Sequence, residues 1–321
     1  MEILILGGSG LLADQLSIVA RARGGRVSWV PGGPNDSERR GGGAGRGRGG
    51  ELEAVLPGER RFDVWIDQRR PEPGEIERTS AAIGEGLGRY VLLTSATWPG
   101  LDPAGASAAP DWERAQAAAE RAFGSRAWCL RTAGLVGAAD PASPLACWLA
   151  RARRGGEMLC PAPEGQGVQW LDARDLAEFL WLGLERECFG RLELGGPHPA
   201  TSLGEVIRAC VDLAGGAARP VWADGSWLEV EARVSPRELP LWRPDGQPSA
   251  GWRLDVRRAR EAGLAHRPLA ATLSDTQREL ERGALAPAPG LGLDPAREAR
   301  LLADWARERR SGRRSLEGAE I

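Results

Sequence analysis

Met1-Glu-Ile-Leu-Ile-Leu-Gly-Gly-Ser-Gly-Leu-Leu-Ala13 is the stretch of sequence that decides the fold. Its apolar residues 2–6 form a short run ahead of a glycine cluster, which is typical of a buried parallel strand. Residues 11–22 carry apolar side chains at helical spacing, and residues 26–30 form a second strand pattern. Strand, tight turn, helix and strand in this order predict a β-α-β unit.

The turn between the first strand and the first helix has the spacing of a dinucleotide-binding loop. Gly7, Gly10 and Ala13 match Gly-x-x-Gly-x-x-Ala, in which the first glycine permits a tight turn and the second lets the backbone approach a pyrophosphate. The N-terminus of the following helix then faces the anion. We therefore assign Gly7 and Gly10, with the adjacent Leu11 and Leu12, to binding of NAD or NADP.

Strands and helices continue to alternate beyond this unit. Strand patterns and helix patterns follow one another over residues 62–67, 76–87, 90–95, 111–123 and 127–131. This alternation predicts an α/β fold, a Rossmann-like doubly wound parallel sheet with a small C-terminal substrate-binding subdomain. We place the dinucleotide-binding core in residues 1–135, and we expect residues 136–321 to complete the sheet and form the subdomain.

The pattern loosens after residue 137. Further helices and short strands are predicted over residues 144–154, 168–171, 172–184, 192–194, 203–214 and 295–310. The start of one of these helices, Asp172-Ala-Arg-Asp175, suggests an N-cap with an internal ion pair. Gly195-Gly-Pro-His-Pro-Ala200 is expected to be a rigid loop after a strand. Residues 220–248 show tryptophans but little regular pattern.

Composition narrows the classes of function and partner. Of the 321 residues, 42% are hydrophobic, and the net charge of −2 gives no reason to expect nucleic acid or an anionic membrane as a partner. No apolar run approaches the roughly 20 residues of a membrane span, and the N-terminus shows no signal peptide. The five scattered cysteines favour free thiols over a zinc site or disulfide framework. We expect a cytoplasmic monomer or homodimer with a small-molecule substrate.

Lysine is absent, so all 42 residues in the Lys+Arg count are arginines. Much of this excess fits drift in a GC-rich genome, because surface lysines can become arginines at little cost. The second strand, moreover, ends in Trp29-Val-Pro-Gly-Gly-Pro34, where an acid is expected to hold the ribose of NAD. Arg23, Arg39 and Arg40 are the nearby cations for a 2′-phosphate. NAD, NADP and no cofactor all stay open.

Four segments together resemble the atypical and extended short-chain dehydrogenase/reductases, and most closely the NAD-dependent epimerase/dehydratase-like enzymes. They are Ile5-Leu-Gly-Gly-Ser-Gly-Leu-Leu12, Phe62-Asp-Val-Trp-Ile-Asp67, Gly88-Arg-Tyr-Val-Leu-Leu-Thr-Ser95 and Val168-Gln-Trp-Leu-Asp-Ala-Arg-Asp-Leu-Ala177. The resemblance covers most of the chain in the right order. It implies a nicotinamide cofactor and an active site of Ser or Thr, Tyr and Lys, in which the lysine lowers the pKa of the tyrosine.

The resemblance places Ser95 at the family's serine but changes its other two residues. Counting back from Glu120 places Trp112 at the tyrosine position and Gln116 at the lysine position. An indole N–H does not titrate usefully and an amide carries no positive charge, so Tyr–Lys proton transfer is excluded there. The only tyrosine, Tyr90, lies inside a predicted strand.

Other candidate site residues come from strand ends, loops and the family alignment. Ser95, Trp112, Gln116 and the loop residue His198 are our candidate catalytic residues, with Asp111 and Glu113 as alternative acids and His266 expected on the surface. Thr94 and Arg131, at strand ends, are assigned to the cofactor. The resemblance implies a substrate cleft lined by Thr97, Trp98, Trp148 and Trp170.

Three hypotheses follow from these observations. The first is an NAD(P)-using reductase-type enzyme, acting on a small aromatic or specialised metabolite, that has lost its Tyr–Lys relay. The second is a cofactor-independent isomerase, cyclase or lyase of natural-product biosynthesis on the same scaffold, in which a tryptophan-rich cleft orients a reactive substrate. The third is a non-catalytic binding or regulatory module. We rank the first ahead by analogy of fold.

Overall fold

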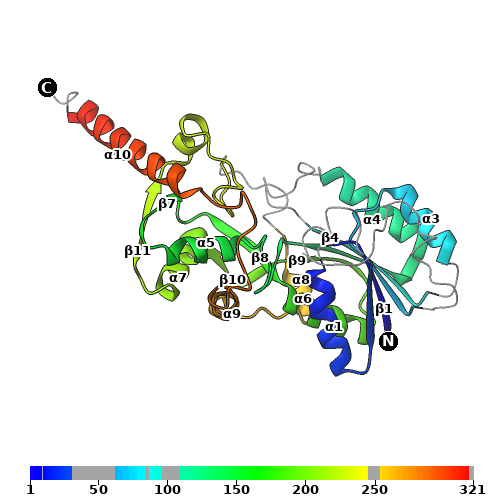
Figure 1. Cartoon of the computed structure of the whole chain (residues 1–321). Coiled ribbons are helices and arrows are strands. Elements are labelled where there is room, and N and C mark those ends of the chain that lie inside the picture. Colours follow the sequence, from blue (N-terminus) through cyan, green and yellow to red (C-terminus); the bar gives the residue numbers. More distant parts are fainter. Residues whose placement is uncertain (9, 31–61, 84–86, 96–108, 245–253, 318–321) are drawn as a thin grey trace.

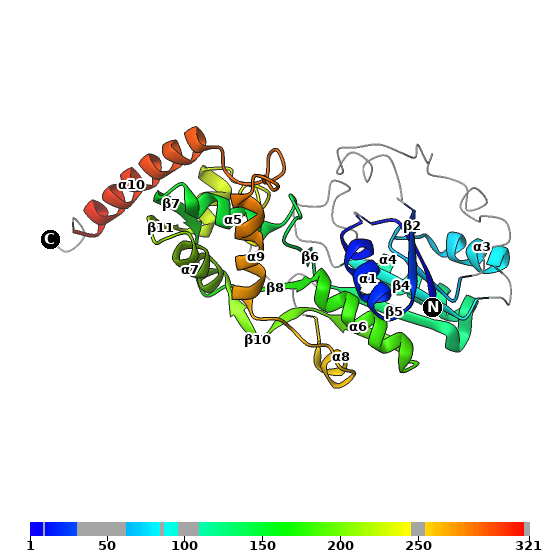
Figure 2. The same cartoon turned by 60° about the horizontal axis from the view of Figure 1, so that its bottom comes forward.

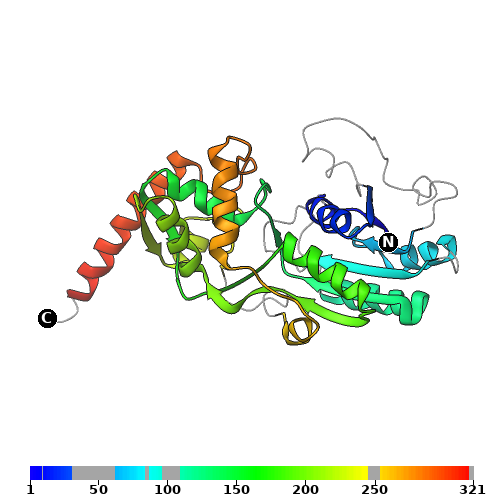
Figure 3. The same ribbon diagram turned by 90° about the horizontal axis from the view of Figure 1, so that it is seen from below.

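The chain folds into two units that lie side by side (Figure 1). The computed structural model describes residues 1–8, 10–30, 62–83, 87–95, 109–244 and 254–317. The N-terminus belongs to the first unit. The C-terminal helix α10 (Pro295–Glu317) extends from the far end of the second unit, as the two turned views also show (Figures 2 and 3).

A six-stranded parallel sheet forms the first unit. Its strands are β1 (Glu2–Leu6), β2 (Arg26–Val30), β3 (Val64–Asp67), β4 (Arg89–Ser95), β5 (Ala127–Thr132) and β9 (Gly190–Leu194). They lie in the order β2-β1-β3-β4-β5-β9, and every neighbouring pair is parallel. The sheet confirms the predicted α/β, Rossmann-like fold, and β9 shows that the second half of the chain contributes a strand to it.

Helices cover both faces of this sheet. Those on one face are α1 (Leu11–Ala22) and α6 (Ala173–Glu185), and those on the other are α3 (Pro73–Ile83) and α4 (Ala109–Phe123). Side chains alternate along a strand, so Ile3 and Ile5 of β1 pack in the α1/α6 layer while Leu4 and Leu6 pack in the α3/α4 layer. This two-sided burial explains why β1 is apolar at every position from Ile3 to Leu6.

The second unit is built from small sheets and helices around its own core. Its strands are β6 (Leu135–Val136), β7 (Gly156–Pro161), β8 (Gly167–Asp172), β10 (Gly196–Ser202) and β11 (Ala218–Ala223), and its helices include α5 (Pro144–Arg153), α7 (Leu203–Leu213) and α9 (Leu269–Glu281). Short helices at Gly124–Arg126 and Arg257–Glu261 (α8) belong with the first unit, which α8 joins through β9. No helix in the described ranges is long and apolar enough to cross a bilayer.

One prediction for the second unit was wrong, and one segment with little sequence pattern contains a strand. Residues 195–200 are not a loop, because Gly196–Ser202 forms β10 at the edge of the sheet β10-β8-β6. Its register with β8 shifts between Gly196 and Thr201, and an edge position with such an irregularity tolerates the two prolines that suggested a loop. Residues 220–248 begin inside β11, which pairs in parallel with β7, and continue into a π-helix at Trp227–Glu231. Pairing with a strand remote in sequence supplies structure that no local pattern reveals.

Asp172 ties the two units together at the start of α6. Its carboxylate caps the helix by accepting the Arg174 backbone N–H at 3.0 Å, and it pairs with the Arg174 guanidinium at 2.7 Å. It also accepts the Thr272 hydroxyl of α9 at 2.8 Å, and Arg174 in turn contacts Asp275 of α9. The predicted N-cap with an internal ion pair is confirmed, and the same carboxylate joins α6 of the first unit to α9 of the second.

Replacement of Gly183 in α6 by alanine should destabilise the protein. The added Cβ would lie 2.3 Å from Cη2 of Trp128, which is fully buried beneath the helix. We expect Gly183→Ala to lower the free energy of unfolding by about 1–3 kcal/mol in urea denaturation, because the indole has no room to move. Gly74→Ala in α3 is the control: its Cβ meets only Arg78 Nη1 at 3.6 Å, so stability should hold or rise. Equal stability of Gly183→Ala and wild type would contradict the packing described.

The junction at Asp172 should be sensitive to acid. Burial alone would raise the pKa of Asp172, but hydrogen bonds and charge from Arg174 outweigh burial and hold the pKa below its ordinary value of 3.8. A depressed folded-state pKa stabilises the protein above the unfolded value, and this stability is lost as the pH falls through the folded value. Asp172→Asn should therefore cost about 3 kcal/mol in urea unfolding near pH 7 and clearly less near pH 3. A cost that does not depend on pH would contradict this assignment.

Candidate functional site

The carboxyl ends of the parallel strands form one edge of the large sheet. Leu6 of β1 lies opposite Asp67 of β3, Asp67 opposite Leu92 of β4, and Ser95 opposite Thr132 of β5. Open α/β sheets bind ligands at this edge. The structure thus brings to one edge the following sequence-predicted residues: Gly7, Gly10, Leu11, Leu12, Thr94, Ser95 and Arg131.

The glycine turn between β1 and α1 adopts a backbone that favours glycine. Gly7, Gly8 and Gly10 have φ angles of 77°, 75° and 80°, in the left-handed region that side chains disfavour. The turn is held on one side by β2, since the Gly7 N–H donates to Val30 O at 2.8 Å and the Trp29 indole donates to Gly7 O at 2.9 Å. Trp29 stands where an acid was expected, and its N–H braces the turn.

A buried cluster after β3 holds the other side of the turn. The Asp67 carboxylate is fully buried and accepts the Arg69 backbone N–H and Nε at 3.0 Å each, Arg69 Nη2 at 2.7 Å and the Tyr90 hydroxyl at 3.0 Å. Arg69 Cγ lies 2.8 Å from where a Cβ on Gly7 would stand. The guanidinium is therefore fixed by Asp67 with its stem packed on the glycine turn.

This cluster was missed from the sequence. An aspartate at the end of a fully apolar strand, followed two residues later by an arginine, was the available signal, since a buried carboxylate needs a partner. Tyr90, the only tyrosine, is part of this cluster because its hydroxyl donates to Asp67. Burial and the Asp67 carboxylate raise the pKa of Tyr90 well above its usual value of 10, so the hydroxyl stays protonated as a donor. For Arg69, burial is the largest single influence and lowers the pKa, but the Asp67 hydrogen bond and the nearby negative charges together outweigh it, so the net pKa is raised.

At the end of β4, Thr94 and Ser95 differ in what the structure describes. The Thr94 hydroxyl oxygen is buried and has no hydrogen-bond partner among the described residues. Ser95 is the last residue of β4, and its side chain lies outside the described part. Arg131 of β5 pairs with Glu193 Oε1 of β9 at 3.4 Å, so its guanidinium already has a carboxylate partner. Thr94 therefore carries hydrogen-bonding capacity that the described residues do not meet.

Trp112 and Gln116 lie on α4, facing the sheet. Gln116 is 3% exposed and its amide donates to Glu120 Oε1 at 3.1 Å. Arg191 of β9 donates two hydrogen bonds of 2.7 Å to the same carboxylate and lowers the pKa of Glu120. Trp112 is half-buried against the α3/α4 core. The Gln116 amide thus binds a carboxylate that Arg191, on the surface, holds ionised.

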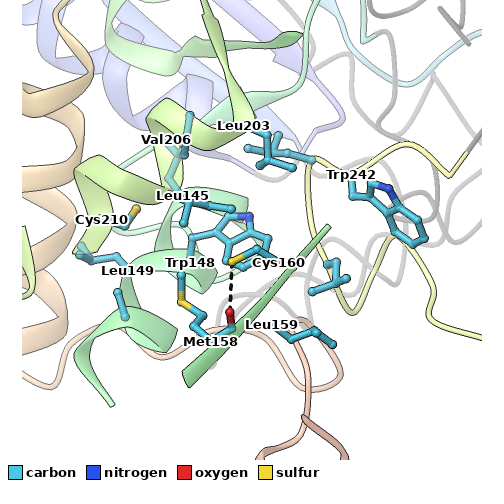
Figure 4. Close-up of a cluster of buried hydrophobic side chains, with 14 of the residues drawn as sticks. Leu145, Trp148, Leu149, Met158, Leu159, Cys160, Leu203, Val206, Cys210 and Trp242 are labelled. Atoms are coloured by element: carbon cyan, nitrogen blue, oxygen red, sulfur yellow. Dashed lines mark hydrogen bonds between the residues drawn. The ribbon is translucent and has the colours of Figure 1, made fainter. Parts of the chain in front are cut away.

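The structure corrects two of the predicted substrate residues. Trp148 is 2% exposed and donates its indole N–H to Pro240 O at 2.8 Å, and Trp170 is 4% exposed in the same core. Figure 4 shows Trp148 enclosed by Leu145, Cys160 and their neighbours. Both tryptophans therefore support the second unit from inside, because its helices close over them. Thr97 and Trp98 lie outside the described residues.

The two histidines lie away from the glycine turn, in or beside β10. His198 is on β10 in the small sheet, and its side chain lies outside the described part. His266 was predicted on the surface but is half-buried, with Nε2 2.7 Å from Gly195 O. The imidazole packs directly on Gly196, where an added Cβ would lie 2.3 Å from the ring. This close contact therefore requires glycine at position 196.

The cysteines and other possible metal ligands do not form a site in the described residues. All five cysteines are free, and no group of three or more His, Cys, Asp or Glu is placed to hold a metal there. Burial raises the pKa of both Cys129 and Cys147 to about 12, which keeps these thiols protonated. Cys129 and Cys147 are therefore core residues.

Solved structures match this architecture along nearly the whole chain. WbmH of Bordetella bronchiseptica, in complex with NAD+, has a TM-score of 0.60 at 15% identity, covering 88% of this chain and 99% of that one. A dTDP-4-dehydrorhamnose reductase of Clostridium acetobutylicum has a TM-score of 0.59 at 14% identity, with 88% and 100% covered. A dTDP-glucose 4,6-dehydratase of Bacillus anthracis, in complex with NAD, has a TM-score of 0.58 at 12% identity, with 88% and 98% covered.

The chain has the fold of the NAD-dependent epimerase/dehydratase enzymes. No family model matches its sequence, and no curated protein matches it. The predicted resemblance to extended short-chain dehydrogenase/reductases is confirmed by structure. At 12–15% identity it is the fold that is shared, and residue roles must be argued from this chain.

Removal of the Tyr90 hydroxyl should test the cluster around Asp67. Tyr90→Phe keeps the ring stack with Phe123, whose centroid lies 4.1 Å away, but leaves the buried carboxylate one donor short. We expect a loss of about 1–3 kcal/mol in the free energy of unfolding, measured by urea denaturation. A variant as stable as wild type would mean that the hydroxyl does not help to satisfy Asp67.

Proposed function

We propose that this protein is an NAD(P)-binding, reductase-type enzyme that works without the Tyr–Lys proton relay. The observation that carries the proposal is the Thr94 hydroxyl, which is buried at the sheet edge of the glycine turn and has no hydrogen-bond partner in the part of the chain that the structure describes. A buried hydroxyl without a partner costs free energy, and such groups occur where a ligand completes the bonding.

The residues at the sheet edge fit a dinucleotide. Gly7, Gly8 and Gly10 form the turn, the N-cap of α1 is itself a glycine, and Arg69 adds a cation beside it. The turn and Arg69 would face the pyrophosphate, and Thr94 would donate to the ribose or carboxamide of the nicotinamide half. A bound nicotinamide supplies hydride transfer to or from a carbon that carries oxygen.

The chain's own residues set limits on the chemistry. Neither the Trp112 indole nor the Gln116 amide can exchange a proton near neutrality, and Tyr90 is a buried donor to Asp67. A proton delivered during reduction must therefore come from water or from a group outside these positions. Ser95, which ends β4, would contribute by hydrogen-bonding the substrate oxygen.

The substrate proposed is a small molecule with a carbonyl or secondary alcohol. Two of the three matched enzymes are named for dTDP-4-dehydrorhamnose and dTDP-glucose, which makes nucleotide sugars the first compounds to assay. An aromatic metabolite is the alternative from the sequence, although Trp148 and Trp170, being core residues, no longer argue for it. We propose a monomer or homodimer located in the cytoplasm.

Titration with NADH and NADPH tests the proposal. Saturable quenching of tryptophan fluorescence is expected, since Trp29 braces the glycine turn. Thr94→Val, which replaces a hydroxyl by a methyl group of the same shape, should weaken binding by about 5- to 10-fold while the free energy of unfolding holds or rises. Thr276→Val is the control, because that hydroxyl already donates to Thr272 O at 2.9 Å; it should leave binding unchanged.

The outcomes of this titration separate the alternatives. If neither nucleotide binds saturably, the reductase is excluded, and turnover of a substrate without nicotinamide would then indicate the cofactor-independent isomerase, cyclase or lyase. Binding without consumption of the cofactor by any substrate would favour a ligand-binding or regulatory module. If Thr94→Val binds as tightly as wild type, Thr94 is not the contact.

A further inference from the structure

The same contact between an aspartate and an arginine two residues later occurs at three places in the described structure, and it indicates a ligand-binding role for Arg69. In this contact, an arginine two residues after an aspartate donates its backbone N–H and Nε to one carboxylate oxygen and Nη2 to the other. It occurs at Asp67/Arg69, Asp172/Arg174 and Asp255/Arg257, with Nη2–oxygen distances of 2.7 Å in all three. In each case the bidentate pair fixes the plane of the guanidinium and leaves Nη1 pointing away from the aspartate.

At Asp172/Arg174 the remaining nitrogen has a clear use. Nη1 of Arg174 binds a second anion, the carboxylate of Asp275 on α9. The Asp172 carboxylate therefore fixes the Arg174 guanidinium in place. The outer edge of the guanidinium, which carries Nη1, binds the second anion. Arg is suited to this because its planar fork serves two acceptors at once, which an ammonium on a flexible stem does less well.

At Asp67/Arg69 the aspartate fixes the guanidinium in the same way, but the outer edge of the guanidinium has no protein acceptor in the described residues. Every hydrogen bond of Arg69 recorded there goes to Asp67, through the backbone N–H, Nε and Nη2. The side chain is 25% exposed, and its stem packs on Gly7. Asp67 itself is fully buried and saturated by donors, with Tyr90 as the fourth. The Arg69 side chain is thus partly exposed, its stem lies against the glycine turn, and its guanidinium is fixed by Asp67.

We propose that the outer edge of the Arg69 guanidinium binds a pyrophosphate oxygen of the dinucleotide at the glycine turn. This inference rests on the proposed function and gives the site its cation. The Asp67 and Tyr90 side chains are positioning residues, since they fix the guanidinium without touching the ligand. The ligand class is a nucleoside diphosphate, with or without the nicotinamide half.

Binding of ADP and adenosine by calorimetry, together with NADH and NADPH, tests the proposal. Arg69→Met should weaken ADP, NADH and NADPH by about 10- to 100-fold, the effect of removing a charge-assisted hydrogen bond, and leave adenosine unchanged. The double variant Asp67→Asn/Arg69→Met removes both charges of the buried pair and protects the fold, so it should show the same loss with wild-type stability. Arg257→Met is the matched control, because the same contact there is exposed.

Each result decides a separate point. Unchanged ADP affinity in the double variant overturns the role of Arg69, whereas absence of saturable nucleotide binding by wild type overturns the proposed function as well. A loss confined to NADPH overturns the pyrophosphate assignment, since only that ligand carries a 2′-phosphate. An equal loss of adenosine affinity would mean that the turn has been distorted and overturns direct phosphate contact. A supporting result also includes steeper salt dependence of ADP binding in wild type than in the double variant.

Discussion

Burial of a carboxylate beside an arginine two residues downstream is the constraint on which this structure depends. Asp67 is fully buried and Asp172 is 3% exposed, and each carboxylate is paired with the guanidinium two residues downstream, since a buried charge without a partner is strongly destabilising. Asp67 binds the Arg69 guanidinium, whose stem packs on the glycine turn at the edge of the large sheet. Asp172 begins α6 and joins the two units through α9. Two copies of one local contact thus hold both the candidate site and the junction between the units.

This constraint also changes the meaning of the missing lysine. Apart from histidine, the basic side chains of this chain are all arginines. They supply permanent positive charge, and no side chain supplies an ammonium group that can titrate. The single tyrosine donates to a buried aspartate, and Gln116 donates to Glu120. Tyr90 and Gln116 therefore contribute hydrogen bonding and packing in this protein, and Arg69 packs against the glycine turn.

The fold was predictable to a large extent because its signals are local. Burial on both faces makes β1 apolar at consecutive positions, and the glycine spacing of the turn follows from its left-handed backbone. The site was predictable only in part. Thr94 was assigned to the candidate site from its place at a strand end and stays a prediction, whereas Arg69 was missed because its contact with Gly7 joins distant parts of the chain. Trp148 was misplaced because a family resemblance carried by short motifs does not show whether a tryptophan lines a cleft or lies in the core.

The sequence by itself determined the parallel sheet, the glycine turn, the capped start of α6 and the exclusion of Tyr–Lys chemistry. All four depend on residue type and on spacing within a few turns or strands. Only the tertiary structure decided that residues 196–202 form a strand, that Trp148 and Trp170 are buried, and that Asp67, Arg69 and Tyr90 meet beside Gly7. The physical reason is that strand pairing, burial and ion pairing depend on partners brought together by folding, and distance along the chain does not encode which partners those are.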